Sequence, residues 1–334
     1  MLNAGVIGMG VGEKHALAYK NHNEVVLKTI CDFDQKILDD VKNKFPDTVA
    51  YTDERSILED KNIDIVSIAS YDNYHAEQIV KAIVSGKHVM AEKPLCLTLD
   101  EMLKIHAVHK LNKGLNLSAN HVLRSNSRFN KLKKDINTGK FGDVFYLEGD
   151  YYWGRKQKLF GWRAEMEFYS IILGAAIHMI DLVMWLMDSK PVSVQAMGND
   201  IASKNTELKF NSFAVILLHF ENGIIAKLTG NGGCVHPHFH GLKIFGTDMT
   251  AIQNRDVAFY LNSSEPGSER VPIVEPYPEK ESRQKVIHSF VNYILDSSIE
   301  PIVTQQDVYD VMSVCFAAEE SMNTGKSISI EYLN

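Results

Sequence analysis

The first 120 residues alternate short, nearly continuous apolar runs with amphipathic segments, and this alternation limits the possible folds more than any other feature. The apolar runs are typical of β-strands, and the segments between them show helical spacing. Strands this rich in Val and Ile must be covered on both faces, which predicts a doubly wound parallel sheet. The predicted strands are 2–7, 25–30, 63–69, 88–91 and 115–119, and the predicted helices are 12–21, 34–45, 74–85 and 98–112.

The pattern changes after Asn120, where longer strand-like runs surround one strongly apolar helix at 171–187. Two of these runs are separated by Phe220-Glu-Asn-Gly-Ile224, which is a hairpin signal. We predict an α+β domain with a large, open, mostly antiparallel sheet and helices on one face. The other predicted elements are strands 144–153, 192–198, 213–220, 224–230 and 240–245 and helices 285–297 and 306–323.

Composition excludes several classes of protein. The chain has 334 residues, enough for two domains, and its 45% hydrophobic and 23% charged residues are ordinary for a globular protein. The net charge of −7 creates no basic field, so we expect no nucleic-acid partner. Because no apolar run is long enough to span a membrane and the 4 cysteines are scattered, we expect a cytoplasmic protein that does not bind membranes.

The first predicted strand runs directly into Gly8-Met-Gly10-Val-Gly12. Glycines there permit a sharp turn into a helix whose first N–H groups face a pyrophosphate. The second strand is followed by Asp32, whose carboxylate can accept hydrogen bonds from an adenosine ribose. These features predict a dinucleotide site, with NAD preferred over NADP because Asp32 would repel a 2′-phosphate. The alternative is a glycine-rich turn without a ligand.

Further motifs are Tyr74-His75-Ala-Glu77, Gly86-Lys-His-Val-Met-Ala-Glu92-Lys93-Pro94, Trp162-Arg163 and the helix "AAIHMIDLVMWL". With the glycine turn, they make the chain resemble the Gfo/Idh/MocA oxidoreductases over nearly its whole length. The resemblance implies an NAD(P)-binding Rossmann domain at 1–121 and a substrate-binding and oligomerisation domain at 122–334. It also implies hydride transfer between nicotinamide and a sugar, cyclitol or sugar nucleotide.

Lys93 ends a predicted strand, and the proline behind it keeps it extended. Open α/β sheets bind ligands at this edge. The resemblance implies that Lys93 hydrogen-bonds the substrate oxygen and stabilises charge as hydride leaves, and the alternative is a solvated lysine at a turn. His75, Glu92 and Asn120 follow strands at the same edge and are candidates, with Lys93, for binding the cofactor. For His75, helix capping or packing remains an alternative.

His178 interrupts the apolar helix and is the second catalytic candidate. A lone histidine on such a face usually belongs to the core, but Asp181 lies three residues further on, close enough to orient an imidazole. The resemblance implies that His178 accepts the hydroxyl proton during oxidation.

The chain departs from the family pattern at Gly174. Many relatives have an aspartate at this position, four residues before the histidine. Either Lys93 and His178 suffice for catalysis, or another residue such as Tyr169 or Tyr71 supplies the missing polar contact. A third possibility is that the chain binds cofactor without the usual oxidation.

Candidates for binding substrate are less specific. Arg124, Trp162 and Arg163 can hold a polyol or an anionic sugar through forked hydrogen bonds and ring stacking. For each arginine an ion pair at a domain interface is the alternative. Tyr169 and Asp181 complete the predicted substrate set.

Cys234, His236, His238 and His240 alternate along "CVHPHFHG", so an extended strand would display all of them on one face. No cluster of acidic residues accompanies them, and we predict no metal site. A polar sheet face or the lining of a substrate cleft is the preferred interpretation.

The sequence therefore predicts an NAD-dependent dehydrogenase or reductase that acts on CH–OH groups of a small carbohydrate-like molecule. It also predicts a homodimer or homotetramer. One alternative function is a glycosidase that uses NAD for transient oxidation, and another is a noncatalytic dinucleotide-binding regulatory protein.

Overall fold

The computed structural model describes residues 1–333, which divide into two compact units. The first unit comprises Met1–Val122 and Lys280–Val308, and the second comprises Leu123–Glu279 and the residues from Tyr309 onwards. By this division the segment Lys280–Val308 lies in the first unit, whereas the resemblance implied that it belongs to the domain at 122–334.

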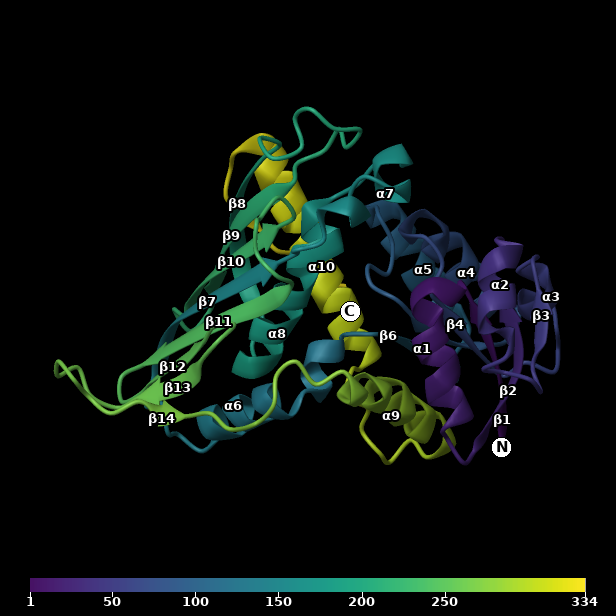
Figure 1. Ribbon diagram of the computed structural model, residues 1–334, viewed down its shortest axis with the longest axis horizontal. Coiled ribbons are helices and arrows are strands. Elements are labelled where there is room, and N and C mark those ends of the chain that lie inside the picture. The colour runs from purple at the N-terminus through teal and green to yellow at the C-terminus, as the bar shows by residue number, and fades with distance from the viewer. Residues whose placement is uncertain (334) are drawn as a thin grey trace. The chain divides into compact units, whose positions relative to one another are not determined.

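A six-stranded parallel sheet of order β3-β2-β1-β4-β5-β6 forms the first unit (Figure 1). This is the order of dinucleotide-binding sheets, in which two three-stranded halves meet between β1 and β4. The predicted doubly wound sheet is confirmed. The strands are β1 Leu2–Ile7, β2 Val25–Cys31, β3 Val49–Tyr51, β4 Ile65–Ile68, β5 His88–Ala91 and β6 Leu117–Ala119.

The helices of the first unit include one from late in the chain. In α9, His288 Nε2 donates to the carbonyl of Ala18 in α1 at 2.8 Å. A second hydrogen bond, 3.1 Å long, joins Asn292 Oδ1 of α9 to His22 Nε2 just after α1. The helix α9 therefore packs along α1 within this unit. The α-helices are α1 Met9–Lys20, α2 Gln35–Lys42, α3 Arg55–Leu58, α4 His75–Val84, α5 Leu99–Leu111 and α9 Gln284–Leu295, and the 3₁₀ turns are η1 Asp72–Tyr74 and η5 Glu281–Arg283.

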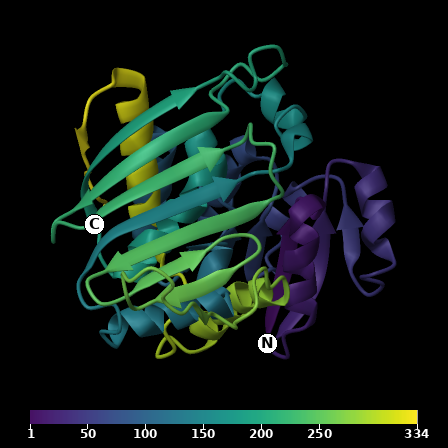
Figure 2. The ribbon, with the colours of Figure 1, turned by 60° about the vertical axis from the view of Figure 1, so that its left-hand side comes forward.

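A nine-stranded sheet of order β14-β13-β12-β11-β7-β10-β9-β8-β15 forms the second unit (Figure 2). All neighbours are antiparallel except β7 and β10, so the predicted mostly antiparallel sheet is confirmed. The strands are β7 Val144–Tyr152, β8 Pro191–Asn199, β9 Phe213–Phe220, β10 Ile225–Asn231, β11 Phe239–Gly246, β12 Thr250–Gln253, β13 Ala258–Leu261, β14 Val271–Pro272 and β15 Ile328–Ser329.

Helices cover one side of this sheet, and Figure 2 looks onto its other side, where no described helix lies. Along β7, Leu147, Gly149 and Tyr151 are buried while Glu148 and Asp150 are half-buried, which is the alternation of a strand with one covered face. A Cβ at Gly149 would lie 3.0 Å from Met179 Cε, so glycine lets α8 approach the sheet. The helices are α6 Ser127–Asn137, α7 Trp162–Glu165, the π-helix η4 Ile172–Ala176, α8 Ile177–Met187 and α10 Gln305–Thr324, with 3₁₀ turns η2 Val122–Ser125 and η3 Lys156–Lys158.

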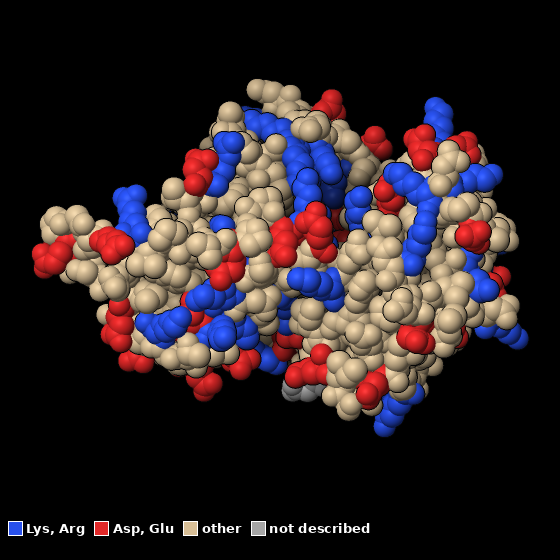
Figure 3. Space-filling view, turned by 60° about the horizontal axis from the view of Figure 1, so that its bottom comes forward, with Lys and Arg blue, Asp and Glu red and all other residues tan. Residues whose placement is uncertain are grey.

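Lys and Arg are interspersed with Asp and Glu over much of the face shown in Figure 3.

None of the helices in the described part of the chain combines the length and the apolar character needed to cross a bilayer.

Candidate active site

The turn between β1 and α1 is shaped by three glycines with different roles. Gly8 has a left-handed φ of 85°, and a Cβ there would lie 2.4 Å from the carbonyl oxygen of Ala69. A Cβ at Gly12 would lie 3.0 Å from Val6 Cγ1, so this glycine permits close packing of α1 on the sheet. At Gly10, by contrast, no described atom beyond its chain neighbours and the nearby backbone of α1 lies within 4 Å of the Cβ position. The fold itself does not require this glycine, and the open space in front of it fits a pyrophosphate.

The N-terminus of α1 is suited to an anion. The N-cap residue Gly8 supplies no capping side chain, and the first turn holds no acidic residue. The helix dipole and the N–H groups that follow that of Met9 therefore favour negative charge. Asp32, at the end of β2, accepts hydrogen bonds from the backbone N–H groups of Met9 at 2.7 Å and Asp34 at 3.0 Å. This carboxylate ties β2 to the glycine turn and places a negative charge at the adenosine half of the sheet. The geometry therefore fits a dinucleotide.

A cluster of buried polar side chains lies at the carboxyl ends of β5 and β6. The sequence analysis identified only some of its members. Glu92 Oε1 lies 3.0 Å from His15 Nε2 and accepts a hydrogen bond from Asn120 Nδ2 at 2.8 Å. Burial would raise the pKa of Glu92, but the hydrogen bonds from His15 and Asn120 outweigh it and lower the pKa to about 2. Glu92 is therefore a carboxylate at any physiological pH. His15 was not predicted, although a histidine in the α1 segment was a signal that could have identified it.

Lys93 directly follows Glu92 at the end of β5, and the Lys93–Pro94 peptide is cis. His75 is fully buried, with Nδ1 2.7 Å from the carbonyl oxygen of Pro94 and Nε2 3.2 Å from that of Ser70. His75 thus braces the turn that carries Lys93, which is the packing role considered for it from the sequence.

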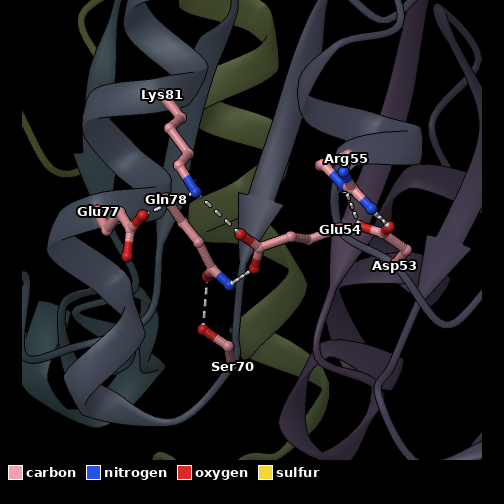
Figure 4. Close-up of polar contacts among 7 residues, drawn as sticks. All are labelled: Asp53, Glu54, Arg55, Ser70, Glu77, Gln78 and Lys81. Carbon is pink, nitrogen blue, oxygen red and sulfur yellow. Dashed lines mark hydrogen bonds and ion pairs between the residues drawn. The ribbon is translucent and has the colours of Figure 1, made fainter.

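The loop after β4 is held by a second polar network (Figure 4). Ser70 Oγ donates to Gln78 Oε1 at 2.6 Å, and Gln78 Nε2 donates to Glu54. Lys81 pairs with Glu54 at 3.5 Å and with Glu77 at 2.8 Å. This network fixes the edge of the sheet where the strand order reverses, which is where dinucleotides bind.

In the second unit, His178 belongs to a cluster of rings. It stacks on Tyr151 of β7 with centroids 5.4 Å apart and planes 4° apart, and it meets His240 of β11 edge-on at 5.7 Å. Tyr151 also contacts His238 at 5.3 Å and Trp153 at 5.8 Å. Residues 151 and 240 are register partners, so both strands present these rings to α8. The stacking restricts the plane of the His178 imidazole.

The alternating residues Cys234, His236, His238 and His240 do not form one strand face. The strand β11 begins only at Phe239, so of these residues only His240 lies in a strand. His238 nevertheless contacts Tyr151, as His240 does. Within residues 1–333, no group of three or more His, Cys, Asp or Glu side chains has an arrangement that could hold a metal ion.

Arg124 and Asp181 form an ion pair. Arg124 Nε donates to Asp181 Oδ1 at 2.9 Å, Nη2 lies 2.8 Å from the same oxygen, and both side chains are buried. The pair joins η2 to α8, which is a structural role of the kind that the sequence left open for Arg124.

Arg163 lies between two aromatic rings. Its guanidinium carbon is 4.0 Å from the centroid of Trp162 and 5.5 Å from that of Trp153. Arg163 Nη1 also donates to the carbonyl of Lys158 at 3.3 Å. The Trp162-Arg163 pair thus forms one stacked group with Trp153, a residue that sequence reasoning missed.

The space beside Gly174 is filled by Tyr169. A Cβ at Gly174 would lie 2.3 Å from the Tyr169 hydroxyl oxygen, and Tyr169 is buried. Tyr71, the other tyrosine considered, packs edge-on against Phe33 in the first unit at 5.4 Å. Of the two, Tyr169 therefore places its hydroxyl next to Gly174, four residues before His178.

The sheet order, the glycine turn and the acidic residue after β2 define the first unit as a dinucleotide-binding Rossmann domain. Residues 2–121 match the model of an oxidoreductase family with an NAD-binding Rossmann fold, and residues 129–252 match that of the GFO/IDH/MocA C-terminal domain. The chain belongs to the Gfo/Idh/MocA family. It is an oxidoreductase of the class that acts on CH–OH groups.

Relatives of known name cover nearly the whole chain. The chain is 25% identical to myo-inositol 2-dehydrogenase of Thermotoga maritima, over 99% of both proteins. It is 22% identical to 1,5-anhydro-D-fructose reductase of Ensifer adhaerens, over 84% of each. The crystal structure of myo-inositol 2-dehydrogenase from Lactobacillus plantarum superposes with a TM-score of 0.83 at 25% identity, over 99% of both chains.

Proposed function

We propose that the protein is an NAD-dependent dehydrogenase or reductase of a small polyhydroxylated compound, namely a sugar, a cyclitol or a sugar nucleotide. The observation that carries the proposal is the open space at Gly10 in the first turn of α1, with a lysine at the end of β5 in the other half of the same sheet. Relatives named for inositol and for an anhydro-sugar support a hydroxylated ring as substrate. Asp32 supports NAD over NADP because its charge repels a 2′-phosphate.

In this mechanism, Lys93 donates a hydrogen bond to the substrate oxygen and stabilises the negative charge that develops there. His178 accepts the hydroxyl proton during oxidation and returns it during reduction. The nicotinamide, when bound, supplies the acceptor or donor of hydride. The stacking of His178 on Tyr151 keeps the imidazole in one plane, and His75 holds the turn that bears Lys93.

The test is to follow the absorbance of reduced nicotinamide with purified protein across a panel of cyclitols, sugars and sugar nucleotides. Lys93→Ala and His178→Ala are expected to lower kcat by about 10²- to 10⁴-fold while leaving the Kd for cofactor within a few-fold. Lys61→Ala, at an exposed position, is the control. Parent rates in either active-site variant would contradict the role assigned to that residue.

Two other results would replace the proposal. Tightly held cofactor with bond cleavage and no net reduction would indicate a glycosidase that uses transient oxidation. Cofactor binding without turnover of any compound in the panel would indicate a regulatory dinucleotide-binding protein.

We also propose that the protein is a cytoplasmic homodimer or homotetramer. On β8, β9 and β10, Met197, Leu217 and Ile225 alternate with buried residues and are 61%, 43% and 45% exposed, so they lie on the open face of the large sheet. Burying such a face against a second copy removes apolar surface from water. Light scattering on the intact protein tests this, and Leu217→Lys is expected to shift the mass toward the monomer.

A further inference from the structure

The buried cluster around Glu92 has a fixed direction of hydrogen bonding. Because Glu92 is ionised and a carboxylate only accepts, His15 Nε2 must carry a proton. On the other side of the ring, His15 Nδ1 lies 2.9 Å from Ser67 Oγ, which lies 2.8 Å from the Tyr19 hydroxyl. Burial raises the pKa of Tyr19 far above its usual range, so this hydroxyl remains a donor. The chain of donors therefore runs from Tyr19 through Ser67 and His15 to Glu92.

The direction of these hydrogen bonds also fixes the orientation of the side-chain amide of Asn120. Its Nδ2 lies 2.8 Å from Glu92 Oε1 and 3.2 Å from His15 Nε2. Flipping the amide would bring Oδ1 against the carboxylate oxygen, where two acceptors repel each other. The backbone cannot adjust, because the N–H of Asn120 donates to the carbonyl of Ala91 at 2.9 Å. Oδ1 must therefore point away from Glu92.

Asn120 Oδ1 is a buried acceptor that has no hydrogen-bond partner among the residues described. The residue is only 6% exposed. An acceptor left without a donor in such a place is destabilising, so a buried atom of this kind indicates a donor that binds there.

The position of Asn120 identifies the donor. It follows β6 and neighbours the end of β5, in the half of the sheet that lies across the strand reversal from Asp32. In a dinucleotide site of this topology, the half opposite the adenosine ribose receives the nicotinamide. The carboxamide of nicotinamide carries two N–H donors, whereas adenosine diphosphate ribose has only ribose hydroxyl groups at that end.

We propose that Asn120 Oδ1 accepts a hydrogen bond from the carboxamide N–H of the nicotinamide, and that Glu92 and His15 act as positioning residues for this acceptor. The inference deepens the proposed function and depends on the dinucleotide site. Its physical consequence is selectivity for a carboxamide over a group of the same shape that lacks N–H. The hydrogen bond also restricts the rotation of the carboxamide.

The test is binding, measured by calorimetry on the full chain freed of cofactor, with three probes. The probes are NAD, its 3-acetylpyridine analogue, in which a methyl group replaces the carboxamide NH₂, and adenosine diphosphate ribose. For the parent protein, the analogue is expected to bind about 10-fold more weakly than NAD, which corresponds to about 1.4 kcal/mol. For Asn120→Ala, the two dinucleotides are expected to bind within about 2-fold of each other.

Glu92→Gln tests the positioning role, since a neutral amide at 92 no longer fixes the orientation of Asn120. Discrimination between NAD and the analogue is expected to fall at least about 3-fold in this variant, with Asn120 still present. Adenosine diphosphate ribose is NAD without the nicotinamide ring. It is the folding control and is expected to bind all three proteins equally, because it has no carboxamide to contact Asn120.

The outcomes separate this inference from the proposed function. Equal affinity of the parent protein for NAD and the analogue would overturn the inference, as would unchanged discrimination in Asn120→Ala. In both cases, binding of adenosine diphosphate ribose would leave the dinucleotide site intact. If neither adenosine diphosphate ribose nor NAD bound the parent protein, the proposed function and the inference would both be wrong.

Discussion

The substitution Gly10→Ala is expected to stabilise the fold and to weaken cofactor binding. Beyond its chain neighbours and the nearby backbone of α1, no described atom lies within 4 Å of the Cβ position at Gly10, and its φ is not in the left-handed region. Alanine reduces the conformational entropy of the unfolded chain and favours a helix, and Gly10 is the second residue of α1. The free energy of unfolding should therefore rise by about 0.5 kcal/mol, and Tm by about 1–2 °C.

The same methyl group occupies the space assigned to the pyrophosphate. A hydrogen bond from a backbone N–H to a charged group contributes about 1.5–3 kcal/mol. Loss of one such bond would weaken NAD binding by about 10- to 150-fold. Gly10→Ala is therefore expected to move stability and affinity in opposite directions.

Gly12→Ala is the matched control in the same turn. Its Cβ would lie 3.0 Å from Val6 Cγ1 and 3.1 Å from Ala69 Cβ, so it should lower the free energy of unfolding by about 1–3 kcal/mol. Circular dichroism during heating measures stability, and calorimetric titration with NAD measures affinity. A Gly10→Ala protein that bound NAD within 2-fold of the parent would refute the placement of the pyrophosphate, because the space would then be ordinary solvent.

Three further outcomes are expected. Burial raises the pKa of Glu319 to about 7, although the hydrogen bond from Ser170 acts in the opposite direction. The folded protein therefore binds a proton at Glu319 more tightly than the unfolded chain does. Protonated Glu319 contributes its full stabilisation of the fold below a pH of about 4.5, the pKa of this group in the unfolded chain. This contribution is lost as the pH rises through about 7. Urea unfolding at pH 5 and pH 8 should show this loss, and Glu319→Gln should reduce it. Arg124→Ala should lower the free energy of unfolding by about 3–5 kcal/mol, because it leaves the buried Asp181 carboxylate without this partner, and a loss below 1 kcal/mol would contradict that reasoning. Tyr169→Phe should reduce kcat, because it removes the hydroxyl beside Gly174, and should leave the Kd for NAD unchanged; unchanged steady-state kinetics would show that Tyr169 serves only in packing.

The sequence predicted the parallel sheet well because its strands are buried on both faces and read as continuous apolar runs. Strand 88–91, for example, was predicted with the bounds it has in the structure. The three-residue strand β3 was missed because Val49 and Tyr51 are exposed and leave no apolar pattern. The strands β12 to β14 were missed because they are two to four residues long and lie between polar loops.

The site was predictable only where it depends on local chain geometry. The glycine turn, Asp32 and the Lys93-Pro94 pair are local features, and their positions at the sheet edge follow from strand topology. The bond between His15 and Glu92 joins residues 77 positions apart, and the stacking of His178 on Tyr151 joins a helix to a strand. Such contacts depend on how elements pack, which no local pattern encodes.

The return of the chain into the first unit through α9 has a consequence for biosynthesis. The surface of α1 that receives His288 has no partner until the ribosome has added the entire strand-rich part of the second unit. At about 5–20 residues per second, this interval lasts on the order of 10–40 seconds. During translation the nucleotide-binding unit therefore exists for a time as an incomplete domain, and a fragment that ends at Val122 would retain that defect permanently.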